Sequence, residues 1–182
     1  MSPLLRSAAL TAVLSATLFT GLVAQGAQRD APTNPACPLL TDQELDTATG
    51  LDYGPGGAVD LMGQGIFGGA TCLWGGMGAD PAKDLPQVGV VFIPPSSRGS
   101  HTEFYRGRSP EAGCTRETLR DVGDFAFVES CQKAQPGVRV YVKTGRNDVF
   151  LVVDQLVERP LSWAQPVAVA LAKAAALRAR DQ

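Results

Sequence analysis

The sequence predicts a single α+β domain, in which a mainly antiparallel sheet of about five strands packs against a short N-terminal helix and a C-terminal helix. Three observations lead to this fold class. Short apolar or alternating segments, separated by turn residues, fill the middle of the chain, as expected for antiparallel strands. Segments with helix-start signals lie before and after them. The 182-residue chain is long enough for one such domain with a substantial core.

A short helix is predicted to begin after Thr41. Thr41 is followed three residues later by Glu44, the pattern of a capping box, in which each side chain bonds the other residue's backbone N–H. Leu40 and Leu45 are placed to pack on each other across this helix start. Gly50 is expected to end the helix.

Strands are predicted wherever apolar residues run together or alternate with polar ones. Residues 138–143 alternate valine with Arg139, Tyr141 and Lys143, which indicates a strand with one face in water. A hairpin turn at residues 145–148 links this strand to the next, and a polar loop, Pro94–Arg108, holds His101. The predicted strands are Ala70–Trp74, Gln87–Ile93, Phe125–Ser130, Val138–Lys143 and Val149–Val157.

The C-terminal segment is predicted to be an amphipathic helix. Ser162 and Gln165 form a second candidate capping box, and Pro166 would lie in the tolerated first turn. Lys173, Arg178 and Arg180 are expected to face solvent. The stripe expected to face the sheet is Val167, Ala170, Leu171, Ala174 and Leu177.

The N-terminus has the pattern of a secretory signal peptide. Arg6 precedes an apolar run, residues 8–24, that no charge interrupts, and small residues suitable for cleavage lie at Ala24 and Gly26. We therefore expect a signal peptide at residues 1–26, a linker at 27–36 and an extracytoplasmic domain at 37–182, which is secreted, periplasmic or associated with the cell envelope. Membrane attachment is expected only if the signal is retained uncleaved.

The chain contains four cysteines: Cys37, Cys72, Cys114 and Cys131. They form no C-x-x-C pair, and His101 is the only histidine, so we expect no metal site. An even number of cysteines in an exported chain favours two disulfides, for which three connectivities exist.

Residues 63–68 spell G-x-G-x-x-G, the fingerprint of dinucleotide-binding loops. That fingerprint works only between a buried strand and a helix, so that the pyrophosphate meets the helix N-terminus. Here residues 58–62 do not have the composition of a buried strand, and residues 71–74 predict a strand instead of a helix. We therefore expect no nucleotide and no other cofactor.

Other catalytic motifs are also unconvincing. S-x-x-K at residues 130–133 and K-T-G at 143–145 are typical of penicillin-binding enzymes, but here they lie too close together and no S-D-N element is present. We interpret His101 as a solvated loop residue, and Asp121 and Asp124 as turn formers. No catalytic residue is assigned, and the protein is expected not to be an enzyme.

The charge distribution argues against nucleic acid as a partner. Without residues 1–26 the chain carries 15 basic and 18 acidic residues, scattered without a basic stripe that would meet phosphates.

Several short motifs are similar to those of secreted actinobacterial lipoproteins of unknown function. They are the opening Pro35-Ala36-Cys37-Pro38-Leu39-Leu40-Thr41-Asp42-Gln43-Glu44, then Cys72-Leu73-Trp74, then Val122-Gly123-Asp124-Phe125-Ala126, and an Ala-rich C-terminal helix. The resemblance implies an α+β domain of the Mog1/PsbP-like kind, with Cys37 bridged to Cys72, and it supplies no catalytic residues. The chain departs from that group in lacking its lipid-anchoring cysteine and in the extra residue Ala36.

For the remaining pair we expect a Cys114–Cys131 disulfide. These cysteines bracket the turn at Gly123-Asp124, and two strands that fold back on each other bring their ends within bridging distance.

Our leading functional hypothesis is a non-enzymatic extracytoplasmic binding or interaction domain of the bacterial cell envelope, whose partner is an envelope protein, a lipid or a glycan. One alternative is a small envelope hydrolase or transferase that uses the loop around His101. A second alternative is a secreted inhibitor of an external enzyme.

The first prediction concerns the N-terminus. Because no cysteine lies between Met1 and Ala36, the mature protein is expected to start near Gln25 or Ala27 without a lipid. Intact-mass measurement of exported protein checks this, and a mass increment of a diacylglycerol group would contradict it.

Overall fold

The computed structural model describes residues 34–59, 68–75, 85–132, 136–154 and 159–182. Thr33–Gln182 forms one compact unit, the α+β domain. The expected signal peptide and residues 27–33 of the expected linker lie outside the described residues. Asn34 and Ala36 already belong to the packed domain, because Asn34 donates to the carbonyl oxygen of Thr71 (2.9 Å) and Ala36 is fully buried.

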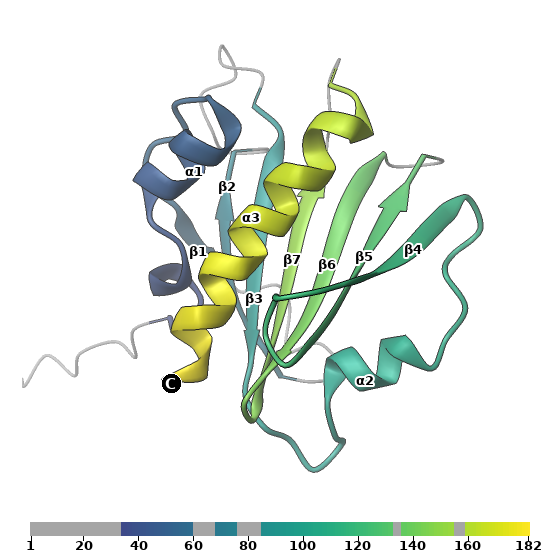
Figure 1. Ribbon diagram of the computed structural model, residues 1–182. Coiled ribbons are helices and arrows are strands. Elements are labelled where there is room, and N and C mark those ends of the chain that lie inside the picture. Colours follow the sequence, from purple (N-terminus) through teal and green to yellow (C-terminus); the bar gives the residue numbers. More distant parts are fainter. Residues whose placement is uncertain (1–33, 60–67, 76–84, 133–135, 155–158) are drawn as a thin grey trace, which may run out of the picture. The chain divides into compact units, whose positions relative to one another are not determined.

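The domain is one antiparallel sheet with α3 packed across one face (Figure 1). The sheet has seven strands in the order β1-β2-β3-β7-β6-β5-β4, and each neighbouring pair is antiparallel. The strands are β1 (Gly57–Val59), β2 (Ala70–Trp74), β3 (Gln87–Ile93), β4 (Cys114–Leu119), β5 (Phe125–Cys131), β6 (Gly137–Thr144) and β7 (Asn147–Asp154). The helices are the 3-10 turn η1 (Cys37–Leu39), α1 (Asp42–Thr49), α2 (His101–Arg106) and α3 (Leu161–Arg180).

The α+β class is confirmed, but the predicted number of strands was too low. The two missed strands are the edges, β1 and β4. β1 has only three residues, and β4 reads Cys-Thr-Arg-Glu-Thr-Leu, with no apolar run or alternation. Edge strands are often wet on one side, so their sequences carry a weak hydrophobic signal. The expected polar loop at 94–108 was also wrong in part, because it contains α2.

The last hairpin is tighter than expected. Thr144 pairs with Asn147, so only Gly145 and Arg146 form the turn, with Gly145 at φ 59°. β7 ends at Asp154, and Val157 lies outside the described residues.

The start of α1 is confirmed. Thr41 Oγ1 accepts from the N–H of Glu44 (3.2 Å), and the carboxylate of Glu44 accepts from the N–H of Thr41 (2.9 Å). Gly50 ends the helix at φ 71°. Glu44 also binds the guanidinium of Arg178 on α3 (2.8 Å), and this bond lowers the pKa of Glu44 to about 2. Arg178, expected to face solvent, therefore ties α3 to α1.

α3 differs from its prediction in two respects. It begins at Leu161 after Pro160 with no side-chain cap, so the capping box at Ser162 was wrong, and Pro166 lies in the second turn. Its buried stripe is also rotated, because Ala170 is exposed and Leu177 is 64% exposed. The buried residues are Ala164, Val167, Ala168, Leu171, Ala172, Ala175, Ala176 and Ala179. The facing strands carry bulky valines, so the helix presents its small residues to them.

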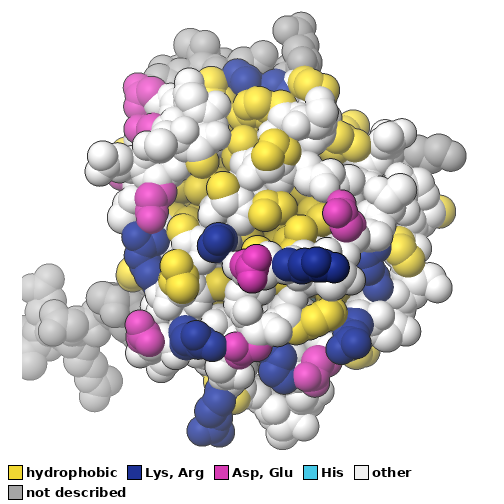
Figure 2. Space-filling model, in the orientation of Figure 1, with side chains coloured by type: hydrophobic (Ala, Val, Ile, Leu, Met, Phe, Trp, Pro, Cys, Tyr) yellow, Lys and Arg dark blue, Asp and Glu magenta, His cyan; other side chains and the backbone are white. Residues whose placement is uncertain are grey.

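Figure 2 views the domain from the α3 side, where hydrophobic side chains gather in the centre and no histidine is visible. Among the described residues, the structure contains no helix of sufficient length and hydropathy to span a membrane.

Two disulfides fasten the sheet, with the expected pairing. Cys37–Cys72 joins η1 to β2, with Cα atoms 5.0 Å apart. Cys114–Cys131 joins directly opposed residues of β4 and β5, with Cα atoms 4.0 Å apart.

We predict that Leu171→Ala lowers the free energy of unfolding by about 2–4 kcal/mol, because it leaves a cavity between α3 and the sheet. Leu177→Ala, on the exposed side of the same helix, is the matched control and is expected to have little effect. Chemical denaturation of both variants measures the difference. Equal stabilities would contradict the observed rotation of the helix.

Candidate functional site

The side of the sheet opposite α3 carries a cluster of polar and aromatic side chains. Along β6, Val138, Val140 and Val142 lie in the α3-facing core, so Arg139, Tyr141 and Lys143 point to the opposite side. α2 lies against β6 and β7 on that side. We call this surface the α2 face. It comprises α2 together with Arg116 of β4, Phe125, Phe127 and Glu129 of β5, Arg139, Tyr141 and Lys143 of β6, and Asp148 and Phe150 of β7.

Tyr141 is the centre of an aromatic cluster on the α2 face. Its ring stacks on Phe127, with centroids 4.6 Å apart, and lies 4.8 Å from Phe150. α2 adds the rings of Tyr105 at 5.1 Å and His101 at 5.8 Å. Burial among these groups raises the pKa of the Tyr141 hydroxyl, which therefore stays neutral.

Asp148 fixes the start of α2 to the β6–β7 hairpin. Its buried carboxylate accepts hydrogen bonds from the hydroxyl of Ser100 (2.7 Å), the N–H of His101 (3.0 Å) and the N–H of Thr102 (3.2 Å). A short helix has little stability of its own, so we attribute the placement of α2 to this carboxylate and to the aromatic contacts.

Ser100, His101 and Asp148 are the residue types of a hydrolytic triad, but their bonds are structural. Ser100 Oγ accepts from the N–H of Glu103 (3.2 Å) while it donates to Asp148, so the hydroxyl serves as the N-cap of α2. The interpretation of His101 as a solvated loop residue was wrong, because its ring is partly buried among aromatic rings. Burial lowers the pKa of His101, and the charge of Asp148 opposes this shift.

Three arginines lie over aromatic rings of this region. Arg106 lies over Phe125 (4.4 Å from Cζ to the centroid) and Arg108 lies over Phe104 (4.1 Å). The third, Arg116, lies over Phe127 and also pairs with the buried carboxylate of Glu129.

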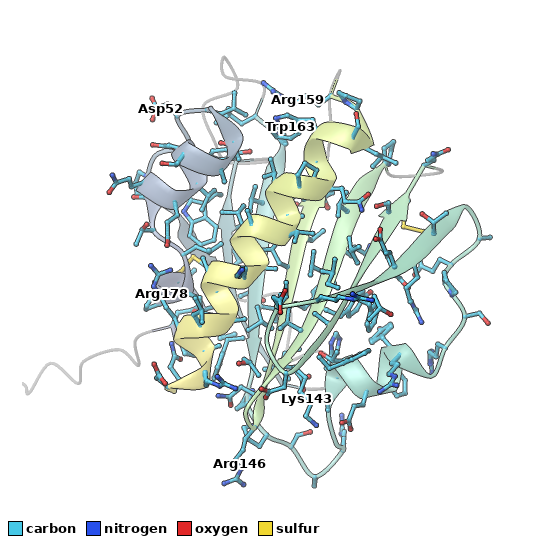
Figure 3. All side chains as sticks on the ribbon, viewed as in Figure 1. Asp52, Lys143, Arg146, Arg159, Trp163 and Arg178 are labelled. Atoms are coloured by element: carbon cyan, nitrogen blue, oxygen red, sulfur yellow. A yellow bond between two sulfur atoms is a disulfide. The ribbon has the colours of Figure 1, made fainter. Side chains whose placement is uncertain are left out.

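The other acidic groups near α2 are already engaged. Glu103 pairs with Lys143, which Figure 3 labels, at 2.6 Å, and Glu111 pairs with Arg139 at 3.0 Å. In the described part of the chain, no carboxylate pairs with the exposed arginines Arg106 and Arg108. Their guanidinium edges are therefore available to an anionic group from outside.

The structure separates the residues of the penicillin-binding motifs. Ser130 lies on the α3 side, where its hydroxyl donates to Gln165 of α3 (3.2 Å), whereas Lys143 lies on the α2 face. Lys133 lies outside the described residues. Ser130 and Lys143 therefore cannot share a site.

The remaining motif residues are those of the glycine motif and the two aspartates, Asp121 and Asp124. Residues 63–67 of the glycine motif lie outside the described residues, and the element after the motif is the strand β2, as expected. Asp121 is exposed at φ 60°, and Asp124 accepts from the N–H of Gly145 (2.6 Å) and pairs with Arg180 (2.7 Å). Over the described ranges, no three His, Cys, Asp or Glu side chains come together as a candidate metal site.

Comparison with known proteins gives no guide to this surface. No family model, curated protein or solved structure significantly matches the chain.

Sequence reasoning missed the α2 face because five elements, α2, β4, β5, β6 and β7, build it. One local signal was present, since Ser100 is followed three residues later by Glu103, the pattern of a helix start. No local pattern indicates that Asp148 binds that helix start across 46 to 48 residues of sequence.

We predict that Asp148→Ala releases α2 from the sheet, because three N–H or O–H groups lose their common acceptor. Bonds to a charged acceptor suggest a loss of about 2 kcal/mol in the free energy of unfolding. Amide hydrogen exchange should accelerate at residues 101–106 while the β3–β7–β6 centre stays protected. Asp124→Ala is the control, because its carboxylate binds Gly145 of the β6–β7 turn and Arg180 of α3 but no group of α2. Unchanged exchange of α2 in Asp148→Ala would contradict the role of Asp148.

Proposed function

We propose that this protein is a non-enzymatic binding domain that works outside the cytoplasm and contacts its ligand through the α2 face. The observation that carries the proposal is the pair Arg106 and Arg108, two exposed cations held on aromatic rings with no carboxylate partner in the described part of the chain. Phe104 beside them is 36% exposed, so the surface offers charge and apolar area together.

The bonding of Ser100 and Asp148 favours binding over catalysis. A hydrolase that used Ser100 and His101 would have to break the bonds that hold α2 in place. The same bonds make α2 a rigid platform, which limits the entropy lost on binding.

The two disulfides support a location outside the cytoplasm, where such bonds persist. The resemblance to secreted actinobacterial lipoproteins remains part of this proposal. The Cys37–Cys72 bridge is compatible with that resemblance.

Site-specific photo-cross-linking in the cells that make the protein tests the proposal. A benzophenone amino acid replaces Phe104 in one variant and Leu177 in the other, because these are the two exposed large hydrophobic residues of the described chain. We expect cross-linked products from position 104 and none from position 177. Products from position 177 alone, or equally from both, would contradict binding through the α2 face.

A further inference from the structure

β4 is an edge strand of the sheet, and its backbone register shows which groups it presents outward. The N–H of Gln132 donates to the carbonyl oxygen of Gly113 (3.1 Å), immediately before the pair Cys114↔Cys131. In an antiparallel ladder, hydrogen-bonded and non-hydrogen-bonded pairs alternate. Thr115 and Glu117 therefore bond to β5, whereas Cys114, Arg116 and Thr118 direct their N–H and C=O groups away from the sheet.

The outward backbone groups of Arg116 and Thr118 have no partner among the described residues. The N–H of Cys114, by contrast, donates to the carbonyl oxygen of Glu111 (2.9 Å). The Cys114–Cys131 disulfide holds the start of the strand in place. The ladder can therefore continue from Arg116 to Thr118.

The usual protection of an edge strand is missing from this stretch. Proteins block such edges with proline or with charged side chains that cover the edge. β4 contains no proline, and the side chain of Arg116 is turned back onto the α2 face. There it binds Glu129 and donates to the carbonyl oxygens of Arg108 (2.6 Å) and Arg106 (3.3 Å).

These same bonds place positive charge along the edge. Because Arg116 holds the backbone of Arg106 and Arg108, both residues lie beside β4 on the α2 face. Their guanidinium groups lie on Phe125 and Phe104 without a carboxylate partner in the described ranges. A strand added to β4 would direct alternate side chains toward these cations.

We propose that β4 binds an extended acidic segment of a partner protein, which pairs with Arg116 and Thr118 as an additional strand and directs its carboxylates toward Arg106 and Arg108. Backbone pairing supplies affinity, and the two arginines select for charge. This inference rests on the proposed function, since it names the ligand class of the α2 face.

A second copy of the chain fits this edge poorly. Two antiparallel β4 strands joined through their outward groups can be centred on residue 115, 116, 117 or 118. The register centred on 116 places Arg116 opposite Arg116, that on 117 places Glu117 opposite Glu117, and that on 118 places Arg116 opposite Arg120, so like charges meet in all three. The register centred on 115 requires Cys114, whose N–H already donates to Glu111.

The test uses the folded domain and a short blocked peptide in which Glu alternates with Val. Fluorescence anisotropy should show binding of this peptide, and the same peptide with Lys in place of Glu should bind at least about tenfold more weakly. On binding, amide hydrogen exchange should slow at Arg116 and Thr118, whose N–H groups have no hydrogen-bond partner among the described residues of the free protein. Binding without this protection would overturn strand pairing, and equal binding of the Lys peptide would overturn the charge selection.

Two variants test the backbone pairing and the charge recognition separately. Thr118→Pro removes an outward N–H and no bond to β5, so the fold should persist while peptide affinity falls about tenfold. Arg106→Ala with Arg108→Ala should also weaken the acidic peptide by about tenfold and reduce the salt dependence of binding. Arg146→Ala, an exposed cation on the β6–β7 turn (Figure 3), is the control and should bind like the wild type.

The outcomes distinguish this inference from the proposed function. If position 104 still gives cross-linked products but the acidic peptide does not bind, the binding domain stands and strand addition at β4 is rejected. A concentration-dependent dimer that protects Arg116 and Thr118 without any peptide would also overturn the inference.

Discussion

The contact between the small-residue side of α3 and the valine rows of β6 and β7 determines the rest of this structure. Alanines at 168, 172, 175 and 179 let the helix approach strands whose inward side chains are mostly valine. Two side chains of the hairpin bind the last turns of the helix. Thr144 donates to the carbonyl oxygen of Ala176 (3.2 Å), and Asn147 donates to that of Ala179 (2.7 Å). Because strand side chains alternate, this contact turns Arg139, Tyr141 and Asp148 to the other face.

The α2 face results from this alternation of side chains between the two faces of the sheet. Tyr141 and Phe150 give α2 a surface to pack on, and Asp148 fixes its first residues. Lys143 and Arg139 neutralise the neighbouring acids Glu103 and Glu111. Arg106 and Arg108, which pair with no carboxylate in the described part of the chain, lie near β4, although the whole chain has a net charge of −2. A local positive surface in an acidic chain favours recognition of one anionic segment over general attraction to polyanions.

The central strands were predictable because burial on both faces requires apolar residues. β2 and β3 were predicted with their observed bounds, and α1 was predicted from its capping box. The edges were not predictable in the same way, since Arg116 and Glu117 stabilise β4 through long-range bonds that leave no local pattern. The orientation of α3 was mispredicted because large apolar residues such as Leu177 were assumed to face the sheet, whereas alanines permit the closer contact.

The candidate site was harder to predict from the sequence than the edge strands, because tertiary contacts build it. The two disulfides of the domain could be predicted, Cys37–Cys72 from the resemblance and Cys114–Cys131 from two strands that fold back on each other. Phe104, Arg106 and Arg108, which we propose contact the ligand, lie in a segment whose sequence predicts a polar loop. Their arrangement depends on Asp148, Phe125 and Arg116, which come from three other strands.

The close contact of α3 with the sheet is tested most directly by comparing Ala172→Leu with Ala170→Leu in chemical denaturation. Ala172 is fully buried and Ala170 is exposed on the same helix. A leucine at 172 has no room between helix and strands, so the free energy of unfolding should fall by about 1–3 kcal/mol, while a leucine at 170 should change it little. An Ala172→Leu variant as stable as Ala170→Leu would contradict the close contact of α3 with the sheet, and with it the division into two faces on which the α2 face depends.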